Sequence, residues 1–233
     1  MPEAPITPPG AVIFDLDGTL VDTVETRIRA WLAVFEEEGI PAERDRVAAL
    51  IGADGRKLAR EIGARSGTAV DGERAEEIDR RSGEIYEELN RAPSPLPGAR
   101  DLLAELGSRG MRWAIATSSR AEQVGTSVDA LGLPERPMIV DGSHVEHAKP
   151  APDLLLYAAR TLEIPPERCW YVGDSTWDMT AAVAAGMTAI GVTTGAVDAP
   201  ALQRAGARRV IGSLGELVPL LAEGTEAAGQ SSS

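Results

Sequence analysis

Short apolar runs alternate with segments of helical periodicity along most of this chain. The runs expected to form β-strands are residues 11–14, 113–116, 138–140, 170–172, 189–192 and 209–211. Several are apolar throughout, as strands buried on both faces are. Helical patterns over 98–110, 121–131, 152–162 and 178–185 separate them. This alternation predicts an α/β fold with a Rossmann-like parallel sheet and helices on both of its faces.

The interval from residue 23 to about residue 91 breaks the alternation, because it contains helical patterns and no convincing strand. The apolar faces comprise Val24, Ile28, Trp31, Leu32 and Phe35, and later Ala75, Ile78, Ser82, Ile85 and Leu89. We therefore expect an all-helical domain over 22–95, inserted into an α/β core over 11–21 and 96–222. Residues 93–97, Pro-Ser-Pro-Leu-Pro, predict a stiff connector that avoids strand and helix. Flexible termini are expected over 1–10 and 223–233.

The 233-residue composition, 43% hydrophobic and 25% charged, suits a folded globule. The net charge of −13 gives no broad attraction to nucleic acid or anionic lipid, so an anionic ligand needs a local positive cluster or a bound cation. The single cysteine, Cys169, excludes an intramolecular disulfide. No apolar stretch approaches membrane length and no leader pattern is present, so a cytoplasmic protein is expected. The sequence leaves monomer and homodimer open.

Polar residues follow the expected strands at positions where chemistry can be carried out. They are Asp15, Asp17 and Thr19 after the first strand, Thr117, Ser118 and Ser119 after the second, Lys149 before a helix, and Asp174, Ser175 and Asp178 after the fourth. Taken singly, each group has an ordinary interpretation as a turn, a helix cap or an exposed lysine.

Together these groups place carboxylates, hydroxyls and one cation at the same edge of a parallel sheet. Carboxylate oxygens suit Mg²⁺, and a lysine with hydroxyl donors suits phosphate. A carboxylate beside a bound cation is able to attack phosphorus and form an aspartyl-phosphate. The combination indicates phosphoryl transfer.

The order Asp-x-Asp-Gly-Thr, Thr-Ser, Lys-Pro, Gly-Asp-Ser-x-x-Asp resembles the four motifs of the haloacid dehalogenase superfamily. The resemblance runs from about residue 11 to residue 217 and is greatest to the phosphoglycolate phosphatase and β-phosphoglucomutase branch. It implies that the helical insertion is a mobile cap that selects the leaving group. It also argues against dehalogenation, because dehalogenases of the superfamily lack the second aspartate, here Asp17.

The resemblance assigns a role to each matching residue. Asp15 would be the nucleophile and a Mg²⁺ ligand. Asp17 would be the general acid and base, with its main-chain carbonyl as a metal ligand. Thr117 and the main chain at Ser118 would bind the phosphoryl group, and Lys149 would neutralise its charge. Asp174 would bind Mg²⁺ directly. Asp178 would either bind the metal through water or hold Lys149 in place.

Specificity is expected in the cap, where Arg56 and Lys57 would meet a second anionic group or serve as ordinary surface charges. Arg27 occupies the position twelve residues after the nucleophile, where β-phosphoglucomutases carry a histidine. Trp177 would pack under the cap or form a pocket wall. The two histidines, His144 and His147, fit ordinary loop positions as well as a place beside Lys149.

The resulting hypothesis is a magnesium-dependent hydrolase of a small phosphorylated metabolite, such as phosphoglycolate or a sugar phosphate. A phosphosugar mutase and a catalytically silent binding protein on the same fold remain as alternatives. A dinucleotide-binding dehydrogenase is not supported, because no Gly-x-Gly-x-x-Gly follows the first strand.

Overall fold

The computed structural model describes residues 6–221, which contain a six-stranded parallel sheet. Its strands are β1 (Ala11–Phe14), β4 (Arg112–Ala116), β5 (Ile139–Val140), β6 (Cys169–Gly173), β7 (Thr188–Val192) and β8 (Arg209–Ile211), in the order β5-β4-β1-β6-β7-β8. All six expected strands are therefore confirmed, with ends that differ by one residue at most. β1 lies at the centre between β4 and β6, so the first motif enters the middle of the sheet.

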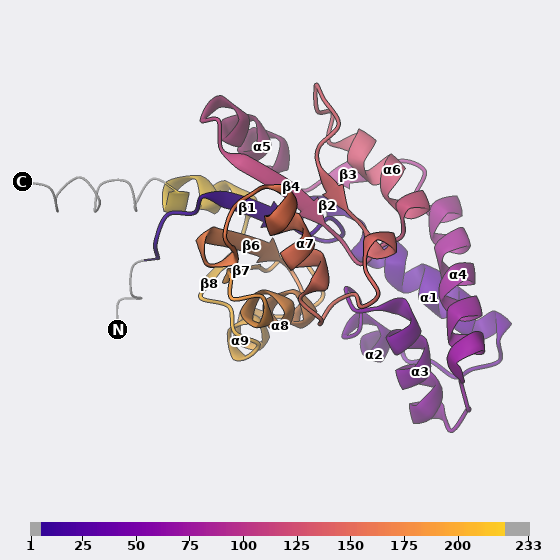
Figure 1. Ribbon diagram of the computed structural model, residues 1–233. Helices are drawn as coiled ribbons and strands as arrows, with labels where there is room; N and C mark the ends of the chain where they lie inside the picture. The colour runs from indigo at the N-terminus through magenta and orange to yellow at the C-terminus, as the bar shows by residue number, and fades with distance from the viewer. Residues whose placement is uncertain (1–5, 222–233) are drawn as a thin grey trace, which may run out of the picture.

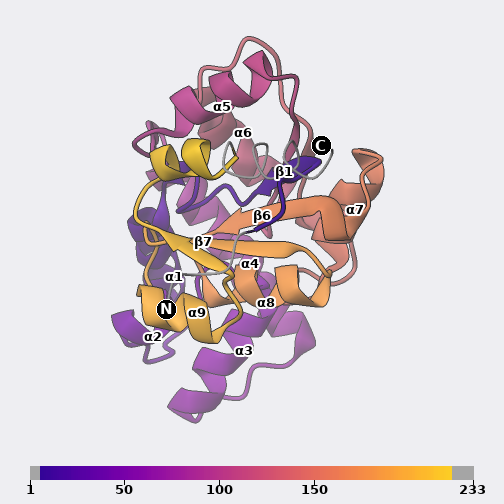
Figure 2. The ribbon, with the colours of Figure 1, turned by 90° about the vertical axis from the view of Figure 1, so that its left-hand side faces the viewer.

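Helices cover both faces of this sheet (Figure 2). They are α5 (Ala99–Ser108), α6 (Ala121–Ala130), α7 (Asp153–Thr161), α8 (Thr176–Ala184) and α9 (Ala199–Arg204). Short 3₁₀ turns occur at η1 (Gly142–His144), η2 (Pro166–Arg168) and η3 (Leu214–Glu216). The helices expected at 98–110, 121–131, 152–162 and 178–185 are present, with ends that shift by one or two residues.

Alternate residues of β1 enter two separate hydrophobic cores. Val12 and Phe14 pack with the apolar residues of α5 and α6 on one face. Ala11 and Ile13 pack with those of α7, α8 and α9 on the other. Because both faces of β1 are buried, its residues are all apolar until the strand ends at Phe14.

The four helices that lie between β2 (Val21–Asp22) and β3 (Ser94–Pro95) in the sequence form a third hydrophobic core. They are α1 (Val24–Glu37), α2 (Arg44–Ala48), α3 (Gly55–Ser66) and α4 (Gly72–Leu89). Figure 1 shows them gathered at one side of the molecule, beyond the carboxyl ends of the sheet strands. The expected apolar faces supply this core except at Ser82, which lines a cavity, and at Leu89, which is 38% exposed.

The connector at residues 93–97 does contain a strand, so the expectation that it avoids strand structure is wrong. β3 pairs antiparallel with β2, with Val21 opposite Pro95 and Asp22 opposite Ser94. A proline is tolerated there because the ribbon has only two strands and needs no hydrogen bond from that nitrogen. The Leu96 N–H donates to the Leu20 carbonyl at 2.9 Å and holds the two crossing segments together.

Residues 6–10 lie against the core, which corrects the expectation of a loose arm for this part of the N-terminus. The Trp170 indole N–H donates to the Thr7 carbonyl at 3.0 Å, and the Gly10 N–H donates to the Arg168 carbonyl at 2.7 Å. Residues 1–5 and 223–233, where flexibility is also expected, lie outside the described residues. Within 6–221, no helix combines the length and apolar character needed to cross a bilayer.

The helical core makes a stability prediction that two residues of α4 test. Ile78 is 1% exposed and Leu89 is 38% exposed. Ile78→Ala should lower the free energy of unfolding by about 2–5 kcal/mol, because it leaves a cavity. Leu89→Ala on the same helix should lower it by less than about 1 kcal/mol. Urea unfolding followed by circular dichroism measures both, and equal losses would contradict the assignment of this core.

Candidate active site

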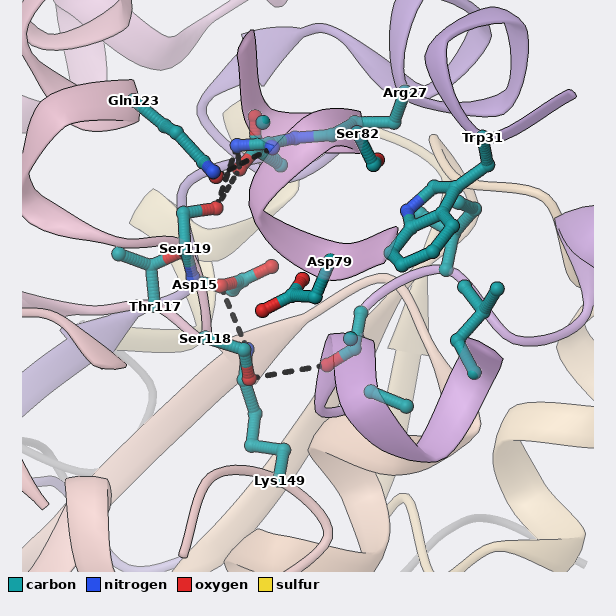
Figure 3. A pocket seen from close by; sticks show the side chains of 17 residues that line it. Asp15, Arg27, Trp31, Asp79, Ser82, Thr117, Ser118, Ser119, Gln123 and Lys149 are labelled. Atoms are coloured by element: carbon teal, nitrogen blue, oxygen red, sulfur yellow. Dashed lines mark hydrogen bonds and ion pairs between the residues drawn. The ribbon is translucent and has the colours of Figure 1, made fainter. Parts of the chain in front are cut away.

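The carboxyl ends of β1, β4 and β6 and the segment before α7 deliver the expected polar residues to one place (Figure 3). Asp15, Thr117 and Lys149 line a common cavity of about 60 Å³, which lies between the sheet and helices α1, α3 and α4. Asp174 lies beside it in the acidic group formed with Asp15. Parallel strands that end at one edge bring these residues together although they are up to 159 positions apart.

Lys149 is a charged side chain of this site with no solvent exposure, as is Asp178. Its Nζ donates at 2.7 Å to Asp15 Oδ1 and at 2.7 Å to Asp178 Oδ1. Burial alone would lower the pKa of Lys149, but the two carboxylates raise it above its usual range. The ammonium group is therefore charged at all ordinary pH values.

Tyr171 is a member of this network that the sequence analysis missed. Its hydroxyl accepts from Lys149 Nζ at 3.1 Å and lies 3.0 Å from Asp178 Oδ1 and 3.1 Å from the Ala116 carbonyl. A hydroxyl-bearing residue within an otherwise apolar buried strand was the available signal, because such a hydroxyl requires a buried partner.

Asp178 uses both carboxylate oxygens within the protein. Oδ1 holds Lys149, and Oδ2 accepts from the Ser175 backbone N–H at 3.0 Å and from its hydroxyl at 2.6 Å. Of the two arrangements expected for Asp178, the structure contains the hold on Lys149. The first turn of α8 fixes this position through a capping box with Ser175.

Three buried carboxylates, those of Asp15, Asp174 and Asp178, place oxygen atoms within 4.8 Å of one another. Lys149 contacts two of them, Asp15 and Asp178, so the three carboxylates and the lysine carry a formal charge of −2 when all are ionised. Burial raises the pKa of Asp15 to about 7, against the lowering effect of Lys149. Burial and the charge of Asp178 likewise raise the pKa of Asp174 well above its usual range. A divalent cation would balance this excess negative charge.

Two glycines make room for the Asp174 carboxylate. A Cβ at Gly18, where φ is +78°, would lie 2.5 Å from Asp174 Oδ2, and one at Gly195 would lie 1.9 Å from it. Asp174 Oδ1 accepts from the Thr19 hydroxyl at 2.9 Å, whereas no hydrogen bond within residues 6–221 reaches Oδ2. The donor set is all oxygen with one free carboxylate oxygen on Asp174, which fits a hard cation such as Mg²⁺. Gly195 carried no signal in the sequence.

Asp17 faces the helical insertion, away from this acidic group. Its Oδ1 accepts from Thr23 Oγ1 at 2.6 Å and from the Tyr86 hydroxyl at 3.0 Å. Its Oδ2 accepts from Arg27 at 2.9 Å and from Ser119 Oγ at 2.7 Å. Burial alone would raise the pKa of Asp17, but Arg27 and the hydroxyls of Thr23 and Ser119 together lower it. The expected metal ligand at this residue is the main-chain carbonyl, and this side-chain orientation leaves that role open.

Arg27 connects the insertion to the sheet side of the site. Its guanidinium lies 3.4 Å from the centre of the Tyr86 ring and donates to Gln123 Oε1 at 2.8 Å. Tyr86 and Gln123 were not expected as site residues. The position of Tyr86 on the helical pattern of residues 75–89 gave no sign that its hydroxyl would reach Asp17.

Thr117 and Ser118 line the cavity, as expected for residues that bind a phosphoryl group. Thr117 is buried and accepts from the Ser119 N–H at 3.2 Å. Ser118 donates to the Gly52 carbonyl, which precedes α3, at 3.2 Å. Figure 3 shows both residues beside Asp15.

Arg56 and Lys57 do not line this cavity, although the sequence placed them near the substrate. Arg56 binds Asp54 at 2.7 Å and faces Glu76 at 3.9 Å, so acidic neighbours already neutralise it. Lys57 lies 4.4 Å from the centre of the Trp177 ring. Trp177 packs under the insertion, with its indole N–H donating to the Ala49 carbonyl at 3.2 Å.

The histidines also lie outside the cavity lining. His144 accepts from the Asp141 N–H at 3.3 Å within a 3₁₀ turn, and His147 lies 3.7 Å from Asp153. Both therefore have local structural partners.

The residues 12–192 match the family described as haloacid dehalogenase-like hydrolase. The chain belongs to this family. It is 33% identical over 190 residues to the β-phosphoglucomutase of Bacillus subtilis, covering 79% of this chain and 84% of that protein. It is also 33% identical over 225 residues to the phosphoglycolate phosphatase of Chromobacterium violaceum, covering 92% and 97%.

Among solved structures, a hydrolase from Pseudomonas syringae superposes with a TM-score of 0.87. The two chains are 35% identical, and the match covers 91% of this chain and 98% of that one. The expected superfamily, the α/β fold and the enzyme class, a phosphatase, are confirmed for this member of the haloacid dehalogenase-like hydrolases.

The buried ion pair between Arg27 and Asp17 predicts a large effect on stability. The two side chains are 12% and 10% exposed, so Arg27→Met leaves a buried carboxylate without its cation. We expect a loss of about 3–5 kcal/mol in the free energy of unfolding. Arg56→Met removes a cation that is 40% exposed and should cost less than about 1 kcal/mol. Similar losses in urea unfolding would show that the Arg27 pair contributes no more than a surface pair.

The raised pKa of Asp15 predicts a pH dependence in chelator-treated protein. Between about pH 4 and 7 folded Asp15 binds a proton that the unfolded chain has released. The free energy of unfolding should therefore fall as pH rises from about 4 toward 7 and level off above it, with a slope of up to about 1.4 kcal/mol per pH unit for each such proton.

Unfolding of wild type and Asp15→Asn in EDTA, compared between pH 5 and 8, measures this effect. The slope should become shallower in Asp15→Asn and stay unchanged in the control Asp129→Asn, which alters an exposed carboxylate. A slope that Asp15→Asn leaves unaltered would refute the assignment of the proton to Asp15.

Proposed function

We propose that this enzyme hydrolyses a small phosphate monoester through an aspartyl-phosphate formed on Asp15, with Mg²⁺ as cofactor. The observation that carries the proposal is the buried Lys149, which binds Asp15 and Asp178 beside a third carboxylate, Asp174. A buried group with this excess of negative charge is suited to a cation and, through it, to an anionic substrate.

In this proposal Asp15 attacks phosphorus with the oxygen that Lys149 does not hold. Lys149 keeps Asp15 oriented and offsets negative charge on the phosphoryl group. Thr117 and the main chain at Ser118 donate to the phosphoryl oxygens. The side chains of Asp15 and Asp174 and the main-chain carbonyl of Asp17 would hold Mg²⁺. When bound, the ion neutralises phosphoryl charge as a Lewis acid.

Asp17 is the proposed general acid for the leaving oxygen and then the base that activates water. In the described arrangement it is held as a carboxylate by Arg27, Thr23 and Tyr86. These partners belong to the insertion or to its junction with β2. We therefore propose that residues 22–95 act as a cap that moves relative to a core of 11–21 and 96–222, and that this movement repositions Asp17, still paired with Arg27, relative to Asp15.

Hydrolysis is favoured over a mutase reaction by the side chains that line the cavity. Arg27 stands where a mutase of this branch carries a histidine, and it is already paired with Asp17. A mutase must bind a second phosphate, which requires an uncommitted cation. Among the cavity-lining residues within 6–221, the cations are Arg27 and Lys149, and both are engaged in ion pairs.

The separate roles proposed for Asp15 and Asp17 predict a burst of product release in the variant Asp17→Asn. With p-nitrophenyl phosphate, whose leaving group needs no acid, Asp17→Asn should release about one nitrophenolate per enzyme and then slow by at least about 100-fold. The physical reason is that the aspartyl-phosphate forms but lacks the base that activates water. Stopped-flow absorbance measures the burst, and acid-quenched protein should carry covalent phosphate.

Asp15→Asn is the matched control, because it preserves shape and removes the nucleophile. It should show no burst and no covalent phosphate, and EDTA should abolish turnover in wild type. A burst in Asp15→Asn would mean that another residue is the nucleophile. Turnover that survives chelation would remove the metal from the proposal.

A further inference from the structure

One wall of the cavity is formed by the helical insertion and is acidic. Figure 3 shows the Asp79 carboxylate of α4 pointing into the cavity toward Asp15. Ser82, one turn further along α4, and the apolar side chains of Trp31 and Leu58 also line this wall. It faces the proposed phosphoryl site, so it contacts whatever group the phosphate is attached to.

The Asp79 carboxylate has one oxygen engaged and one available. Arg120 donates to Oδ2 at 2.7 Å, and within residues 6–221 no hydrogen bond reaches Oδ1. The side chain is only 18% exposed. The start of α3 packs tightly beside it, since a Cβ at Gly55 would lie 1.8 Å from Oδ1. Glycine at position 55 is thus needed for the carboxylate to take this place.

Ser82 adds a second polar group on the same face of α4. It is 4% exposed, and its hydroxyl has no hydrogen-bond partner in the described part of the chain. Asp79 and Ser82 are three residues apart and therefore neighbours on α4. Both line the cavity, so their remaining hydrogen-bonding capacity is directed at whatever occupies it.

The cations around the cavity do not offset this acidic wall for an incoming anion. Arg27 is paired with Asp17, and Lys149 with Asp15 and Asp178. Arg120 is already shared between Asp79 and Glu76. A second carboxylate or phosphate on the substrate would therefore lie near Asp79 without a free cation to receive it.

We infer, on the basis of the proposed function, that the substrate's leaving group is uncharged and polyhydroxylated. One of its hydroxyls donates to Asp79 Oδ1, a second bonds to Ser82, and its carbon chain lies against Trp31 and Leu58. Phosphorylated acids, including phosphoglycolate, are the class that this site rejects.

Two matched pairs of esters test the inference. Glycerol 3-phosphate and 3-phosphoglycerate differ only in a terminal CH₂OH against a carboxylate, as do glucitol 6-phosphate and 6-phosphogluconate. In each pair that turns over, kcat/KM should be at least about tenfold higher for the polyol ester, because Asp79 repels the carboxylate at short range. Release of inorganic phosphate in Mg²⁺ measures all four.

Asp79→Asn keeps the shape of the side chain and removes its charge. The preference for the polyol ester should fall at least about fivefold, mainly through a higher kcat/KM for the acid. Glu76→Gln is the control, because Glu76 also binds Arg120 at the other side and does not line the cavity. It should leave the ratio within about twofold of wild type.

The outcomes separate this inference from the proposed function. Equal or faster hydrolysis of the acid member of a pair overturns the inference and leaves the phosphatase mechanism intact. An unchanged ratio in Asp79→Asn, or an equal fall in Glu76→Gln, also overturns it. A wild-type enzyme that releases no nitrophenolate from p-nitrophenyl phosphate in Mg²⁺ would instead remove the proposed function.

Discussion

A lysine side chain with no contact with solvent connects three segments of this protein that are far apart in sequence. Lys149 reaches Asp15 at the end of β1 and Asp178 at the start of α8, each at 2.7 Å. A buried ammonium group needs carboxylates beside it to offset its lost hydration. These buried carboxylates in turn need cations beside them. The arrangement of the strand ends therefore depends on charge balance at this point.

Within the protein itself the negative charges of this site outnumber the positive ones, and this excess of negative charge connects the electrostatics of the site to its function. Asp174 adds a third buried carboxylate, and glycines at positions 18 and 195 leave space for it. Burial raises the pKa of Asp15 and of Asp174 because the charged forms lack sufficient positive partners. A buried site with this excess of negative charge is suited to a divalent cation and a phosphate ester.

A second network couples the helical insertion to the sheet. Asp17 receives hydrogen bonds from Thr23 and Tyr86 and an ion pair from Arg27, all contributed by the insertion or its junction. Ser119 joins the same carboxylate from the core side. The proposed acid–base residue is thus held by the part of the molecule that we propose to move, which would link closure of the site to its chemistry.

The sequence by itself determined the six strands, the inserted helices and the meeting of Asp15, Lys149 and Asp174. These follow from local hydrophobic periodicity and from the rule that parallel strands end at one edge of a sheet. Membership of the family followed from the same motifs.

Only the tertiary structure decided the direction of Asp17, the pairing of Arg27 and the place of Asp79 in the cavity. It also revealed Tyr86 and Tyr171 as hydrogen-bond partners. Their positions depend on how helices from a distant segment pack over the sheet edge, and a helical pattern shows which face is buried but not which polar atom lies opposite. For the same reason the Asp-x-Asp-Gly-Thr motif indicated the reaction, whereas the chemistry of the leaving group depends on residues brought in by the insertion.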